Sequence, residues 1–228
     1  MVDTSLWGWS DPLLQKILNT FEGKKSLLLV RSHLKLDCLG GEYSTLGSLV
    51  YLPALDVSPV DRDAFVQQLQ FASSSIGACP MLDQIYPFYK NPEFHDLTRK
   101  RMSEIQDSLD RIIEEILPLV DRTKLKVEVP YHRVSFHINF HTDEEDIPKI
   151  IAKFIHLISD RVFLMDSYGF EFPTALVSTV IHDPSQHFIR MTGHVLGKEY
   201  DEQVRDAYRA IIEIANRFAK PLPLEDRD

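Results

Sequence analysis

The sequence contains few cysteines and no long apolar run. Among its 228 residues only Cys38 and Cys79 are cysteines, too few for a disulfide scaffold and too far apart for a CxxC metal pair. The apolar run at residues 27–30 is far shorter than the ~20 residues that span a bilayer. The first ten residues lack the basic and apolar regions of a secretory signal. We therefore expect a cytoplasmic protein with no membrane segment.

The chain has fewer positively charged residues than negatively charged ones. The chain has 25 Lys and Arg residues against 34 Asp and Glu residues, a formal net charge of −9, and nucleic-acid partners are unlikely because such proteins usually carry a basic patch. Dinucleotide-binding, Walker, HExxH and GxSxG motifs do not occur. Apolar residues at 44% and charged residues at 26% are typical of a globular chain with a core.

The spacing of apolar residues predicts five helices. Thr142-Asp143-Glu144-Glu145 has the pattern of a capping box that opens the fourth of them. Phe94 to Leu117 has the longest pattern and is long enough to link two domains. The expected helices cover approximately residues 11–22, 59–76, 94–117, 144–158 and 198–219.

Strands are expected between these helices. Residues 26–31 form an apolar run typical of a strand buried on both faces, whereas residues 125–129 and 134–140 alternate like half-buried strands. The pattern indicates an α/β chain with a C-terminal α+β unit, a small sheet covered by two helices. The remaining expected strands are 48–52, 161–165, 175–181 and 187–191.

Three histidines, His132, His137 and His141, cluster within ten residues. On a strand, four residues span about 13 Å, so His137 and His141 are too far apart to share one metal ion. We interpret them as polar residues on the open face of a strand.

A lysine-bearing turn follows the first buried strand, in the sequence Leu28-Leu29-Val30-Arg31-Ser32-His33-Leu34-Lys35. Ligands of α/β sheets bind at the carboxyl ends of strands, and a partly desolvated lysine can form a Schiff base with an aldehyde. The serine, the lysine three residues later and the following glycines resemble the lysine segment of fold-type I pyridoxal-phosphate-dependent aminotransferases of class I/II. The resemblance implies that Lys35 holds pyridoxal 5′-phosphate as an imine and acts as the catalytic base, and that Ser32 contacts the phosphate.

Two further segments resemble the same family. Val2-Asp3-Thr4 is similar to its strand-end aspartate, which implies that Asp3 pairs with the pyridinium nitrogen. The strand His187-Phe188-Ile189-Arg190 resembles the one that carries the substrate-binding arginine, which implies that Arg190 binds the substrate α-carboxylate. Tyr43 stands where the family usually has a phosphate-binding arginine and is assigned to the cofactor site.

The resemblance covers the C-terminal half of such an enzyme. It implies part of a cofactor-binding large domain at residues 1–93, a linking helix at 94–120 and an α+β small domain at 121–228. Its implied partners are an amino-acid substrate, a 2-oxo acid and a second copy in a homodimer. A related lyase, decarboxylase or oxidase on the same scaffold stays open. The alternative is a non-catalytic remnant that serves as a binding or assembly module, which Tyr43 in place of arginine favours.

Overall fold

The computed structural model describes residues 1–5, 12–32, 47–75, 92–158, 162–164, 172–180 and 183–223. These residues form a mixed α/β structure with five α-helices and two small sheets. The chain divides into two compact units, Met1–Lys100 and Arg101–Asp228, which are described separately below. No helix in the described ranges combines the length and the apolar character needed to cross a bilayer.

Two helices of the first unit form where the sequence predicts them. Helix α1 spans Pro12–Phe21 and is followed by Gly23, whose φ of 68° is a conformation that favours glycine. Helix α2 spans Pro59–Ser75. It begins with a side-chain cap, because the Asp61 amide donates to Ser58 Oγ over 3.1 Å and the Ser58 hydroxyl donates back to the Asp61 carboxylate over 2.7 Å.

The first sheet has the strand order β1-β2-β3. Strand β1, Val2–Asp3, is parallel to β2, Leu27–Ser32, and β3, Gly47–Leu52, is antiparallel to β2. Both longer strands were expected, but the expectation that residues 26–31 are buried on both faces is wrong for residues 27–30, which are only half-buried. No residue of α2 is buried, although the ring of its Phe65 contacts Tyr51 of β3, with ring centroids 4.6 Å apart.

Helix α3, Pro92–Ile116, confirms the long helix expected from the sequence. It crosses from the first unit into the second, and a 3₁₀ turn at Leu117–Leu119 follows it. The apolar positions that predicted the helix are all buried: Met102, Ile105, Leu109, Ile112, Ile113 and Ile116.

The second sheet has the order β4-β5-β8-β7-β6. It is antiparallel except for the pair β6 and β7, which is parallel. All five strands lie where the sequence predicts strands, and β8 begins earlier than expected. Their bounds are Leu125–Glu128 for β4, Ser135–His141 for β5, Phe163–Leu164 for β6, Thr174–Val180 for β7 and Asp183–Thr192 for β8.

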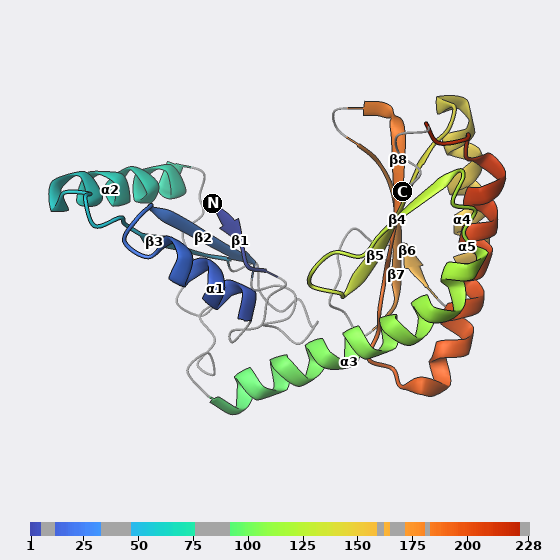
Figure 1. The fold of residues 1–228 in the computed structure, drawn as a ribbon, viewed down its shortest axis with the longest axis horizontal. Coiled ribbons are helices and arrows are strands. Elements are labelled where there is room, and N and C mark those ends of the chain that lie inside the picture. The colour runs from blue at the N-terminus through green and yellow to red at the C-terminus, as the bar shows by residue number, and fades with distance from the viewer. Residues whose placement is uncertain are drawn as a thin grey trace. The chain divides into compact units, whose positions relative to one another are not determined.

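Helices α4, Ile147–Ile158, and α5, Asp201–Phe218, cover one face of this sheet (Figure 1). The arrangement confirms the expected small sheet covered by two helices. Alternate residues of β5 and β8 join the helices and the end of α3 in one apolar core, and each fully buried large side chain contributes about 1.5–3 kcal/mol. The strand residues in this core include Phe136, Ile138, Phe140, Ile189 and Met191.

The expected capping box at residues 142–145 is wrong. Asp143 makes no side-chain cap hydrogen bond, and a 3₁₀ turn at Glu144–Asp146 precedes α4. The Thr142 hydroxyl donates to the carbonyl of Phe218 over 3.0 Å, and the Asp143 carboxylate binds Lys220 over 2.5 Å. Both side chains therefore fasten the start of α4 to the end of α5, contacts that local spacing does not reveal.

Thr192, the last residue of β8, and the two residues after it are each held by a different part of the second unit. The Tyr208 hydroxyl of α5 donates to the Thr192 carbonyl over 2.6 Å, the Gly193 amide donates to the Val134 carbonyl over 3.0 Å, and the His194 amide donates to Ser108 Oγ of α3 over 2.7 Å. A Cβ on Gly193 would lie 2.2 Å from the carbonyl oxygen of Ile105. Only glycine fits this close approach between β8 and α3.

The substitution Gly193→Ala is expected to destabilise the second unit by about 2–3 kcal/mol, because the helix backbone of α3 must shift to admit the methyl group. Urea denaturation would measure this loss, with hydrogen-exchange protection of the β8 amides as the probe. Gly47→Ala is the control, since its Cβ would meet the Arg31 carbonyl at 3.2 Å, a contact that a small shift relieves. Equal stability of Gly193→Ala and the unchanged protein would contradict the close approach.

Candidate functional site

The parallel pairing of β1 with β2 brings Asp3 and Ser32 to the same edge of the first sheet. Asp3 is the last residue of β1 and Ser32 is the last residue of β2. In the ladder between the two strands, Asp3 lies opposite Val30. In parallel strands the carboxyl ends meet at one edge, which is where α/β proteins bind ligands. The assignment of Asp3 and Ser32 to a cofactor site stays a prediction.

Ser5 connects the two residues. Its amide donates to Asp3 Oδ1 over 2.8 Å, and its hydroxyl oxygen accepts the Ser32 amide over 2.8 Å. Ser5 itself is buried, whereas Asp3 is exposed. Neither Asp3 Oδ2 nor the Ser32 hydroxyl has a hydrogen-bond partner among the described residues. One carboxylate oxygen and one hydroxyl group thus remain for a ligand at this edge.

The neighbouring residues hold the two strand ends in register. The Arg31 side chain, 7% exposed, donates to the Thr4 carbonyl over 2.5 Å, and the Thr4 amide and hydroxyl both donate to the Val30 carbonyl. Sequence analysis assigned no role to Thr4, Ser5 or Arg31. Their contacts depend on the pairing of segments 27 residues apart, which no local motif indicates.

Lys35 and Tyr43 lie outside the residues that the structure describes. Their assignments, to the cofactor-bound lysine and to the cofactor site, stay predictions. Cys38 and Cys79 lie outside these residues as well.

Arg190 is on β8, on the face of the second sheet opposite the helices. Its neighbours Ile189 and Met191 point into the apolar core, so alternation along the strand turns Arg190 to the other face. There it lies opposite His137 of β5 and Leu176 of β7 in the two strand ladders. Arg190 is only 8% exposed. It is thus a buried arginine outside the apolar core, which distinguishes it from an ordinary surface arginine.

His137 and His141 lie on β5 as expected, whereas His132 precedes the strand, so the interpretation is wrong for His132. His137 is half-buried, and its pKa is lowered first by burial and then by the positive charge of Arg190, while Glu128 opposes the shift. Across the described ranges, no three His, Cys, Asp or Glu side chains are close enough together to hold a metal ion.

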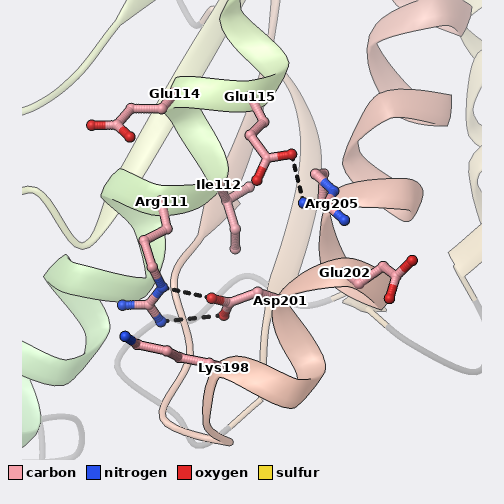
Figure 2. Close-up of a pocket in the computed structure, with 8 residues that line it drawn as sticks. All are labelled: Arg111, Ile112, Glu114, Glu115, Lys198, Asp201, Glu202 and Arg205. Atoms are coloured by element: carbon pink, nitrogen blue, oxygen red, sulfur yellow. Dashed lines mark hydrogen bonds and ion pairs between the residues drawn. The ribbon is translucent and has the colours of Figure 1, made fainter.

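A second polar cluster joins α3 to the start of α5 (Figure 2). The Arg111 guanidinium binds the Asp201 carboxylate through Nε at 2.6 Å and a second nitrogen at 3.3 Å, and Glu115 pairs with Arg205 at 2.5 Å. Arg111, Asp201 and Arg205 line a cavity of about 380 Å³. Sequence analysis missed this cluster because its partners are 90 residues apart.

The buried His194 completes this cluster without forming a catalytic triad. Its Nε2 lies 3.2 Å from Asp201 Oδ1, and its Nδ1 accepts the Leu196 amide over 3.2 Å. Ser108 contacts the backbone amide of His194, not its ring. Because Nδ1 is already occupied by an amide, His194 cannot serve as the base of a serine nucleophile. The cluster fastens α5 to α3.

No protein-family model matches the chain, and no curated protein matches it.

Stability of the second unit is expected to fall as pH decreases below about 6.5. Burial is the largest cause that lowers the pKa of His194, and it also lowers the pKa of His187 and His137. The unfolded chain therefore binds protons at a pH where the folded chain does not. Each histidine adds a slope of at most about 1.4 kcal/mol per pH unit. Urea denaturation at pH values from about 7.5 to about 5.5, roughly one unit on either side of the ordinary histidine pKa, measures the slope.

His194→Gln should reduce this slope because it removes one of the three titrating groups. His156→Gln is the matched control, since His156 is exposed on α4, and it should keep the slope of the unchanged protein. A slope that is the same in His194→Gln as in the control would show that His194 does not contribute.

Proposed function

We propose that this chain is a pyridoxal-phosphate-dependent, aminotransferase-like protein that acts on an amino acid and a 2-oxo acid. The observation that carries the proposal is the shared edge of β1 and β2, where Ser5 joins Asp3 to Ser32. A carboxylate and a hydroxyl group at the carboxyl ends of adjacent parallel strands are the groups that the resemblance implies for the ring nitrogen and the phosphate. The uncommitted Asp3 Oδ2 and Ser32 hydroxyl fit these two tasks.

Each residue of the proposed site has a defined task. Pyridoxal phosphate, when bound, supplies an aromatic ring that accepts electrons from the substrate α-carbon. Asp3 would accept a hydrogen bond from the ring nitrogen and keep that nitrogen protonated. Ser32 would donate to a phosphate oxygen. Lys35 Nζ would hold the group covalently and, once displaced by the substrate, would take the proton from the α-carbon.

Arg190 would bind the α-carboxylate of the substrate. Its planar guanidinium can donate two parallel hydrogen bonds to a carboxylate, and its burial strengthens them because the effective dielectric constant is lower than in water. The same site would accept the carboxylate of the 2-oxo acid in the second half of the reaction. A homodimer is part of the proposal, by resemblance to the family.

The first test is reductive labelling with pyridoxal phosphate. The protein mixed with pyridoxal phosphate should develop a visible absorption band, and borohydride reduction should fix the label on the peptide that contains Lys35. Lys35→Arg should abolish the label. Lys25→Arg is the matched control, since Lys25 is an exposed lysine at the opposite end of β2. Asp3→Asn should weaken cofactor binding about tenfold, the equivalent of one charge-assisted hydrogen bond.

If the label is spread over surface lysines and Lys35→Arg does not reduce the amount of label, the proposed cofactor site is wrong.

An assembly module is the second candidate function, favoured by strand β3. This edge strand carries no charged residue, and its Leu49 and Val50 are 48% and 46% exposed although they point to opposite faces. Natural edge strands usually carry charges, prolines or bulges that prevent pairing with another chain. A strand without them is suited to assembly.

Leu49→Lys is therefore expected to shift the protein toward single chains, because a buried lysine at a paired strand edge costs several kcal/mol. Light scattering measures the mass in solution. Val60→Lys, at a 77% exposed position of α2, should leave the mass unchanged. If the unchanged protein already measures as a single chain at all concentrations, assembly through β3 is wrong. Labelling at Lys35 separates the two candidate functions, since an assembly module needs no such label.

A further inference from the structure

The face of the second sheet opposite the helices carries buried polar residues. Ser135 and Thr192 are 0% and 1% exposed, and Arg190 is 8% exposed. Ser135 lies opposite Thr192, and His137 lies opposite Arg190, in the ladder between β5 and β8. Residues directly opposite each other in an antiparallel ladder have Cβ atoms about 5 Å apart. His137 is therefore the closest side-chain neighbour of Arg190 on β5.

Two contacts orient the imidazole of His137. Its ring stacks at a tilt against Phe188, with ring centroids 5.7 Å apart, and its Nε2 is 3.5 Å from the Ser135 hydroxyl. Nδ1 forms no hydrogen bond with any described residue. When the Ser135 hydroxyl donates to Nε2, the ring proton is on Nδ1 and is available to a ligand.

The charges that face His137 determine its protonation. Arg190 faces it from β8 and Glu128 from β4, and Glu128 is itself 4.0 Å from Lys126. Burial and the charge of Arg190 lower the pKa of His137 and outweigh Glu128. His137 is therefore neutral at pH 7 and becomes positively charged only at a pH below its ordinary value of about 6.5.

We propose that His137 is a second carboxylate-binding residue of the site, which donates from its imidazole to the same carboxylate that Arg190 binds. This inference rests on the proposed function for the identity of the ligand as an amino or 2-oxo acid. A carboxylate has about four lone-pair sites, enough for two bonds from the guanidinium and one from the imidazole. His137 thus selects for ligands whose carboxylate reaches the sheet face between β5 and β8.

Formate titrations followed by NMR test this proposal without pyridoxal phosphate. Formate is a bare carboxylate that stays ionised over the pH range used, and the backbone amides of Ser135 and Arg190 report its binding. The unchanged protein should bind formate more tightly as pH falls from 7.5 to 5.5, values chosen to bracket the ordinary histidine pKa of about 6.5, because His137 gains a positive charge. His137→Phe, which keeps a ring against Phe188, should weaken binding about tenfold at pH 5.5 and remove the pH dependence.

His137→Gln keeps a donor without a titrating group, so it should bind formate better than His137→Phe but without the pH dependence. The matched control is His141→Phe, four residues along the same strand and on the same face, which should bind formate like the unchanged protein. Arg190→Lys should weaken binding because lysine lacks the planar pair of donors. The β5 and β8 amide spectra show whether each variant is folded.

The outcomes separate this inference from the proposed function. Suppose that Lys35 is labelled and that His137→Phe binds formate like the unchanged protein. The proposed role of His137 is then wrong, and the proposed function is still supported. If Lys35 is not labelled but formate binding depends on His137, the carboxylate site is supported and the proposed function is wrong. Formate binding that is the same in Arg190→Lys and His137→Phe as in the unchanged protein overturns the inference.

Discussion

The close contact between Gly193 and helix α3 is the constraint on which the second unit depends. The backbone at Gly193 lies so near the Ile105 carbonyl that no side chain fits between them. Hydrogen bonds hold the residues on either side, Thr192 to Tyr208 of α5 and His194 to Ser108 of α3. Burial raises the pKa of Tyr208, so its hydroxyl stays protonated and remains a donor. The end of β8 is thereby fixed to both helices.

Fixing β8 also fixes the two faces of the second sheet. Its odd-numbered residues Ile189 and Met191 complete the apolar core under α4 and α5, so Arg190 must lie on the other face beside His137. The second sheet thus has one apolar face packed against helices and an opposite face with buried polar residues, among them Ser135 and Arg190.

The first unit is organised differently in the part that the structure describes, where neither α1 nor α2 contributes a buried residue. Helix α2 buries none of its residues, and β3 exposes apolar side chains on both faces. The polar end of β1 and β2 is nevertheless well ordered by hydrogen bonds through Ser5 and Arg31. In the two proposed functions this unit would bind a ligand at Asp3 and Ser32, or a second chain at β3.

Elements with a local signal could be predicted from the amino-acid sequence. Apolar residues three and four apart predicted α3 and α5, and strict alternation predicted β5, because these periods follow directly from helix and strand geometry. The strand-end position of Asp3 was implied by the family resemblance alone, and Ser32, expected in the turn, is the last residue of β2. Tertiary packing, in contrast, makes Thr142 bind Phe218 instead of capping α4, and it leaves most of β2 half-buried. The meeting of Arg111 with Asp201, and of His137 with Arg190, was likewise decided there. These contacts join segments far apart in the chain, and their partners are set by how helices and strands pack, which no local period encodes.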